Sequence, residues 1–89
     1  MTPQKKEQMH LEILTPEKKL FDGEVTGVKL PGALGSFEIL NNHAPIISAL
    51  IKGEVRVKNA QGSQTFKINS GFVECLNNQV TVLVEGVEK

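Results

Sequence analysis

The chain contains no tryptophan and no tyrosine, and its four phenylalanines are its only aromatic residues. Proteins that hold single-stranded nucleic acid stack the bases on aromatic side chains inside a basic groove. Ten lysines and arginines balance ten aspartates and glutamates, so the formal net charge is zero and a basic surface is not expected to dominate. We therefore expect no nucleic-acid partner.

Cysteine and aspartate are each present only once. Cys75 has no partner for an intrachain disulfide, and no Cys/His spacing typical of a structural zinc site is present. Asp22 sits in an Asp-Gly pair that is typical of a turn, and the glutamates are scattered singly. We therefore expect no metal, no cofactor and no paired catalytic carboxylates.

Long hydrophobic runs are also lacking. No apolar stretch approaches the roughly 20 residues of a membrane-spanning helix, so direct membrane insertion is not expected. Residues 1–8 are polar and predict a flexible N-terminal tail rather than a signal peptide. Together with an unpaired cysteine, this favours a cytoplasmic setting. The remainder predicts a single domain over residues 9–87.

What the chain does contain is alternation of period two, which is typical of β-strands. The segments with this pattern or with short apolar runs are 9–14, 19–21, 24–30, 36–40, 46–51, 54–58, 65–68, 71–76 and 79–85. No window has the apolar period of a capped helix. Eight to ten short strands with frequent turns predict an all-β fold, an antiparallel β-sandwich or flattened barrel.

Turn residues separate these segments. We expect breaks at Thr15-Pro16-Glu17, at Asp22-Gly23, at Gln61-Gly62 and at Asn77-Asn78. Pro31-Gly32 suits the two central positions of a type II turn. Val25 and Val28 are out of phase by one residue, and a bulge at Gly27 would restore the alternation.

Two segments are apolar on both faces. Ile46–Ile51 has no polar face, and in Val82-Leu83-Val84 the leucine points away from the valines. A sandwich strand normally presents one face to water. Either another part of the chain covers these outer faces, or a partner does.

Residues 30–45 contain several prolines and glycines, which have unusual backbone preferences, and this stretch also contains His43. One hypothesis is a small β-sandwich enzyme or ligand-binding module with His43 at its site and Cys75 as the candidate partner of His43. The sequence places no third group to orient the imidazole. Gly32–Gly35 lacks the lysine and the following helix of a phosphate-binding loop. The opposing hypothesis is that this loop presents a surface to a partner.

The order of several motifs resembles the epsilon subunit of the F-type, or rotary, ATP synthase. These motifs are His10-Leu11-Glu12-Ile13-Leu14-Thr15-Pro16, Leu20-Phe21-Asp22-Gly23-Glu24-Val25, Leu30-Pro31-Gly32 through His43-Ala44-Pro45, Gly53-Glu54-Val55-Arg56-Val57, Ser70-Gly71-Phe72-Val73-Glu74 and Asn78-Gln79-Val80-Thr81-Val82-Leu83. The resemblance covers nearly all of residues 9–86. The chain departs from the family pattern at Glu38, where glycine is usual, and at Asn41, where proline is usual.

The resemblance implies a ten-stranded β-sandwich in the central stalk of the synthase, with no catalysis of its own. Its implied role is to couple proton-driven rotation to ATP synthesis by docking to the gamma subunit and the c-ring. Candidate gamma-subunit contacts are Thr15, His43, Ala44, Ile47 and Ser48. Candidate c-ring contacts are Ala33, Leu34, Gly35 and Ser36. The implied location is the cytoplasmic face of the bacterial inner membrane, as a peripheral subunit.

Family members commonly continue into a C-terminal two-helix domain that is linked to inhibition and, in some members, to ATP binding. The present sequence stops at Lys89. For these 89 residues we expect no C-terminal helical domain and no nucleotide binding.

Overall fold

The computed structural model describes residues 9–88, all of whose regular structure is β-strand. The expected flexible tail, residues 1–8, lies outside the described residues. The strands are β1 (Met9–Leu14), β2 (Lys19–Val25), β3 (Gly27–Gly32), β4 (Gly35–Leu40), β5 (Ile46–Leu50), β6 (Gly53–Asn59), β7 (Gly62–Leu76) and β8 (Gln79–Glu88). No helix in this part of the chain is long and apolar enough to cross a membrane.

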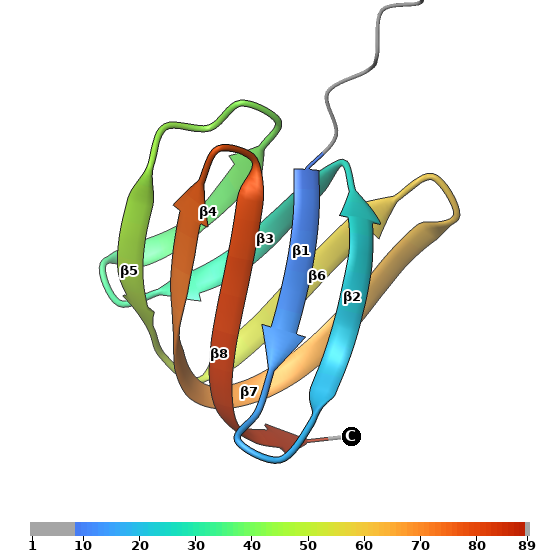
Figure 1. Ribbon diagram of the computed structural model, residues 1–89. Coiled ribbons are helices and arrows are strands. Elements are labelled where there is room, and N and C mark those ends of the chain that lie inside the picture. Colours follow the sequence, from blue (N-terminus) through green and yellow to red (C-terminus); the bar gives the residue numbers. More distant parts are fainter. Residues whose placement is uncertain (1–8, 89) are drawn as a thin grey trace, which may run out of the picture.

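The strands form two packed layers, which confirms the predicted all-β sandwich (Figure 1). The front layer has the order β2-β1-β8-β7-β5, and β3, β4 and β6 form the back layer together with the first half of β7. β7 belongs to both layers because its first half pairs with β6 and its second half pairs with β5 and β8.

The core lies between the layers. It is built from the residues that the alternation of apolar and polar side chains predicts to face inward. Buried residues alternate along β1, β6 and β8 and come to lie against one another. They are Met9, Leu11, Ile13, Val55, Val57, Val80, Val82 and Val84. Among the described residues no polar or charged side chain is buried, so the side chains of this interior contribute through apolar burial rather than through buried polar contacts.

Several expectations about the strands were wrong. The structure has eight strands, which lies within the predicted eight to ten but below the ten that the resemblance implied. The predicted strands 65–68 and 71–76 are one continuous strand, β7. Asp22 and Gly23 are not a turn but lie inside β2, opposite Glu12 and Leu11. The sheet is not wholly antiparallel either, since β1 and β8 run parallel.

The corner between the two layers also differs from expectation. No bulge at Gly27 restores the valine phase; instead the chain bends at Thr26 and splits the expected strand into β2 and β3. The backbone N–H and the hydroxyl of Thr26 both donate to the carbonyl of Lys58, at 2.8 and 3.2 Å. This bend lets Val25 and Val28 both enter the core.

Turn predictions had mixed outcomes. Asn77 and Asn78 form the expected two-residue hairpin turn, and both have positive φ angles, 52° and 62°, as a type I′ turn requires. Pro31 and Gly32 instead end β3, and Ala33 and Leu34 make that turn. The β6–β7 turn falls at Ala60-Gln61, one residue before the expected pair.

A matched pair of substitutions tests this placement of the core. Ile13 is fully buried in β1, whereas Ile47 on β5 is 75% exposed. We expect Ile13→Ala to lower the free energy of unfolding by about 2–5 kcal/mol, and Ile47→Ala to change it by less than about 0.5 kcal/mol. Urea unfolding followed by circular dichroism measures both. Equal losses in the two variants would contradict the assignment of inner and outer faces.

Candidate docking surfaces

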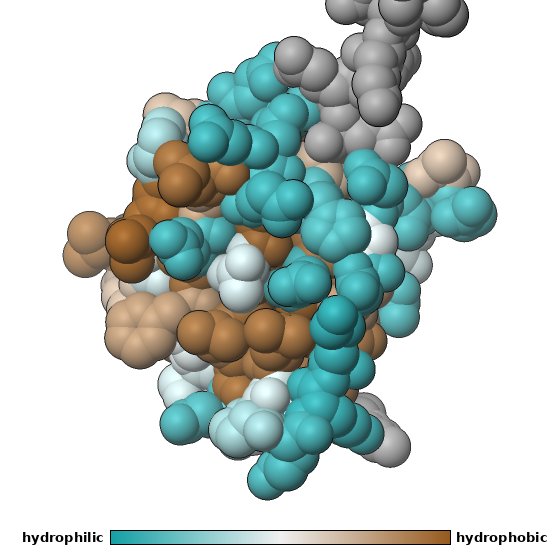
Figure 2. Space-filling view, in the orientation of Figure 1, coloured by the Kyte–Doolittle hydropathy of each residue, from teal (hydrophilic) through white to brown (hydrophobic). Residues whose placement is uncertain are grey.

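A row of apolar side chains crosses the outer face of the front layer. Cα pairing aligns Ala49 of β5 with Phe72 of β7, Phe72 with Leu83 of β8, and Leu83 with Leu14 of β1. Phe72 is 57% exposed and Leu83 is 51% exposed. We call Leu14, Ala49, Phe72 and Leu83 the outer apolar row. Figure 2 shows hydrophobic side chains gathered over this part of the front layer.

The outer apolar row borders a groove of about 520 Å³, which is also lined by Thr15, Pro16 and Gly71. A side chain at Gly71 would run into the backbone carbonyl of Leu83 and lie 3.2 Å from the Cα of Val84. Only glycine therefore lets β7 and β8 approach this closely beneath the groove. Exposed apolar surface bordered by polar residues is typical of interaction sites.

The structure answers the question about segments that are apolar on both faces. In β5, Leu50 faces the core while Ile47 and Ala49 face outward, and in β8 Leu83 faces outward between buried valines. Within residues 9–88, nothing covers these outer side chains fully. The excess of apolar side chains in these segments could be seen in the sequence. Their alignment into one row across four strands could not.

The predicted gamma-subunit contacts do not gather at one point. Thr15 lies in the loop after β1, at the bottom of Figure 1, whereas His43 and Ala44 lie in the loop between β4 and β5 at the top. Ile47 lies between these ends on the outer face. Ser48 is half-buried on the other face of β5, together with Leu50.

Local hydrogen bonds hold the loop after β1 and the loop between β4 and β5, which we call the end loop. The Thr15 hydroxyl oxygen accepts from the backbone N–H groups of Glu17 and Lys18, at 3.3 and 3.0 Å. At the other end, the Asn42 N–H donates to Asn78 Oδ1 at 2.7 Å, and Asn78 Nδ2 donates to Asn42 Oδ1 at 3.2 Å. The loop that carries His43 is thus tied to the β7–β8 turn.

The geometry gives no support to a catalytic His43. Its Nδ1–H donates to the carbonyl of the adjacent Ala44 at 2.7 Å, the one side-chain hydrogen bond that the described part of the chain gives it. Cys75 faces the core and is 1% exposed, and burial raises the pKa of its thiol. A neutral, buried thiol is a poor nucleophile, so no Cys75–His43 pair is set up for catalysis.

The predicted c-ring contacts Ala33, Leu34, Gly35 and Ser36 form the hairpin between β3 and β4. Leu34 is fully exposed at its tip, and Gly35 takes the φ angle of 130° that closes the turn. The Ala33 N–H donates to the carbonyl of Ala49 at 3.0 Å. The hairpin therefore adjoins the β5 end of the outer apolar row.

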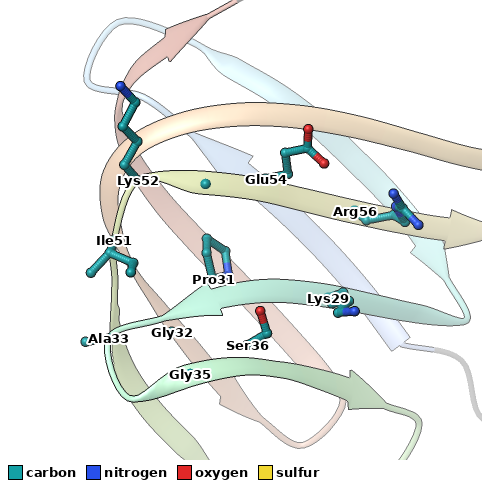
Figure 3. A pocket seen from close by; sticks show the side chains of 11 residues that line it. Lys29, Pro31, Gly32, Ala33, Gly35, Ser36, Ile51, Lys52, Glu54 and Arg56 are labelled. Atoms are coloured by element: carbon teal, nitrogen blue, oxygen red, sulfur yellow. The ribbon is translucent and has the colours of Figure 1, made fainter.

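A second hollow, of about 480 Å³, lies beside this hairpin (Figure 3). Its lining includes Lys29, Lys52 and Arg56 but only one carboxylate, Glu54. Lys29 and Arg56 are directly opposite each other on β3 and β6, and like charges in that arrangement repel. The hollow therefore favours contact with negatively charged or acceptor groups.

Comparison with known proteins identifies the family. Residues 8–89 match the family model described as the ATP synthase, Delta/Epsilon chain, beta-sandwich domain. The chain belongs to this family. Among delta/epsilon-chain relatives, the chloroplastic ATP synthase epsilon chain of Cyanidioschyzon merolae is 42% identical over 81 residues, which cover 91% of this chain and 62% of that protein.

Bacterial members of the delta/epsilon family show similar identity. The ATP synthase epsilon chain of Caulobacter vibrioides is 40% identical over 78 residues, covering 88% of this chain and 91% of that protein. That of Chlorobium limicola is 44% identical over 78 residues, covering 86% of this chain and 89% of that protein. The present chain thus spans nearly all of some relatives and less than two thirds of others.

Solved structures agree on the fold. A chain of the Euglena gracilis mitochondrial ATP synthase, in a structure of OSCP, F1 and c-ring, superposes with a TM-score of 0.84 at 16% identity, covering 99% of this chain and 57% of that one. A chain from the Tetrahymena thermophila mitochondrial ATP synthase central stalk and c-ring gives 0.78 at 21% identity, covering 97% and 69%. The fold of this chain is thus shared with both solved chains at low sequence identity.

The tie between the end loop and the β7–β8 turn can be tested with two neighbouring asparagines. Asn78→Gly removes the side chain that bonds Asn42 while keeping a residue that tolerates positive φ. We expect amide hydrogen exchange at Asn42 to accelerate about three- to tenfold, the equivalent of one hydrogen bond. Asn77→Gly serves as the control, because the described residues give its side chain no hydrogen bond. Unchanged exchange in Asn78→Gly, or equal acceleration in both, would contradict the tie.

Proposed function

We propose that this chain is a non-catalytic subunit of the central stalk, or rotor, of an F-type ATP synthase. It couples proton-driven rotation of the c-ring to ATP synthesis by joining the gamma subunit to the ring. Family membership and relatives named ATP synthase epsilon chain support this proposal. The corresponding location is the cytoplasmic face of a bacterial inner membrane, as a peripheral part of the complex.

The observation that carries the assignment of surfaces is the outer apolar row. Full burial of a leucine or phenylalanine side chain contributes about 1.5–3 kcal/mol, and Phe72 and Leu83 are each about half exposed. Covering the two would contribute on the order of 2 kcal/mol, which a stable partner in the stalk can supply. We assign the row, with Ile47 and Thr15 beside it, to the gamma subunit.

His43 and Ala44 extend this gamma-facing surface to its upper end, where the Asn42–Asn78 bonds hold their loop. Ser48 acts differently. It is half-buried on the inner face of β5 and donates its hydroxyl to the carbonyl of Ala49 at 3.2 Å. Ser48 therefore influences the gamma surface through the backbone of β5 rather than through direct contact.

The β3–β4 hairpin is assigned to the c-ring. Leu34 protrudes from its tip, and the cationic hollow lies beside it. A protruding apolar tip with positive charges behind it fits a partner surface that offers an apolar pocket beside negatively charged or acceptor groups. Because the hairpin of the back layer adjoins the outer apolar row of the front layer through the Ala33–Ala49 hydrogen bond, the two packed layers together would hold stalk and ring.

Charge substitution in the outer apolar row tests the gamma assignment. Phe72→Asp places a carboxylate at the centre of the row on an exposed position, so the isolated chain should stay folded. We expect its affinity for the gamma subunit to fall at least about 30-fold, the loss typical of a central interface residue. Biolayer interferometry with immobilised gamma subunit measures this. Binding as tight as that of the parent chain would remove the row from the interface.

Substitution of the hairpin tip tests the ring assignment separately. We expect Leu34→Asp to leave gamma affinity within about twofold and to reduce recovery of the c-ring with the gamma complex at least about tenfold, since a tip residue can be an interface anchor. Co-purification of the ring with gamma and this chain gives the readout. Normal ring recovery combined with lost gamma binding would exchange the two surfaces.

A further inference from the structure

Four side chains that can bind metal occupy a square at the β1–β2 edge of the front layer, next to the Leu14 end of the outer apolar row. His10 and Glu12 lie two residues apart on β1, and Asp22 and Glu24 lie two residues apart on β2, so each pair shares a face. The Cα pairing sets His10 opposite Glu24 and Glu12 opposite Asp22. Donor atoms of His10, Glu12 and Asp22 all lie within 4.8 Å of one another.

The imidazole is already aimed into this cluster. His10 Nε2 is 2.7 Å from Asp22 Oδ1, and His10 Nδ1 is 3.4 Å from Glu24 Oε2. Desolvation alone would lower the pKa of His10, but its hydrogen bonds to Glu24 and Asp22 outweigh that effect and raise it. The surroundings therefore favour the protonated ring, and a metal ion bound at Nε2 has to displace that proton.

One ammonium group already supplies a positive charge to this cluster. Lys19 Nζ lies 2.9 Å from Asp22 Oδ2 and 3.5 Å from Glu12 Oε2. The hydrogen bond from Lys19 is the largest cause of the lowered pKa of Asp22. Three carboxylates against one ammonium leave two negative charges while His10 is neutral. Lys19 is long and half-exposed, so it can leave the cluster at little cost.

We propose that His10 Nε2 and the carboxylates of Glu12 and Asp22 bind one Zn²⁺ ion, with water in the fourth position. Zinc accepts nitrogen and carboxylate ligands at about 2.0–2.2 Å in a tetrahedron. An imidazole in the set favours zinc over calcium or magnesium, which prefer oxygen ligands alone. Glu24, on the Nδ1 side, accepts from the second ring nitrogen and holds the ring in place, the usual arrangement around zinc-bound histidines.

The sequence alone did not predict that these four side chains would lie together. Asp22 stands beside Gly23 and resembles a turn residue, so its side chain was not expected on a strand face. Once β2 runs straight through this pair, Asp22 and Glu24 fall on the same face as the two ligands of β1. None of the four residues belongs to the outer apolar row or the hairpin, so zinc binding is measured on the isolated chain, separately from binding to the gamma subunit.

Isothermal titration calorimetry of the untagged 89-residue chain with zinc chloride tests the proposal. We expect one ion per chain, at least tenfold weaker binding in His10→Gln and in Asp22→Asn, and tighter binding in Lys19→Ala, from which the competing ammonium is removed. His43→Gln is the matched control, because His43 is the only other histidine, and it should bind as the parent does. No saturable binding, or loss of binding in His43→Gln alone, would overturn the proposal.

A measurement on the unaltered chain guards against variants that fail to fold. Zinc added to the labelled parent chain should shift the imidazole NMR signals of His10 and leave those of His43 in place. Cobalt should replace zinc and give the visible absorption of a four-coordinate ion, and EDTA should abolish it. Shifts confined to His43, or cobalt spectra typical of the hydrated ion, would overturn the proposal as well.

Discussion

The alternation of inward and outward residues over 71–76 of β7 and 79–85 of β8 is the constraint on which the rest of the structure depends. Val73 and Cys75 of β7 and Val82 and Val84 of β8 fill the core, so the residues between them must face outward. Phe72 and Leu83 are thereby placed directly opposite each other on the outer face. A one-residue slip of register would exchange the two faces and empty the core. Core and docking surface are therefore two consequences of one pairing.

Glycine at position 71 makes this pairing possible. Its missing side chain leaves room for the backbone of β8 at the point where β7 passes from one layer to the other. The same close approach forms the groove beside the outer apolar row. Gly71 is thus needed both for the packing of β7 against β8 and for the shape of the groove. The hairpin and the end loop form separate surfaces on either side of β5.

Alternation and local turn chemistry could be predicted from the sequence; long-range pairing could not. The inward faces of β1, β6 and β8 and the Asn77-Asn78 turn came out as expected, because they depend on neighbouring residues. Asp22-Gly23 failed because pairing with β1 outweighs the local preference of that dipeptide for a turn. The parallel pairing of β1 with β8 joins residues about 70 positions apart, and no local pattern encodes it.

The candidate site followed the same division. From the sequence, Leu83 was recognisable as an apolar residue on the outer face of its strand, and Ile47 as part of a segment without a polar face. Ala33–Ser36 came from the family resemblance, since the turn itself was expected at Pro31-Gly32. Predicting the outer apolar row would have required the pairing register of four strands, because only that register aligns Leu14, Ala49, Phe72 and Leu83. The His10–Asp22 cluster required the correct path of β2. In each case the residue types were visible in the sequence, and only the fold shows which of them lie together.

The outer apolar row is the surface that we assign to the gamma subunit. Methyl NMR of the isoleucine- and leucine-labelled chain, titrated with the gamma subunit, tests this assignment directly. We expect the Leu83 and Ile47 methyl signals to shift or broaden first, while the Leu34 methyl signals at the hairpin tip stay in place. Perturbation of Leu34 with Leu83 and Ile47 unchanged would contradict the account.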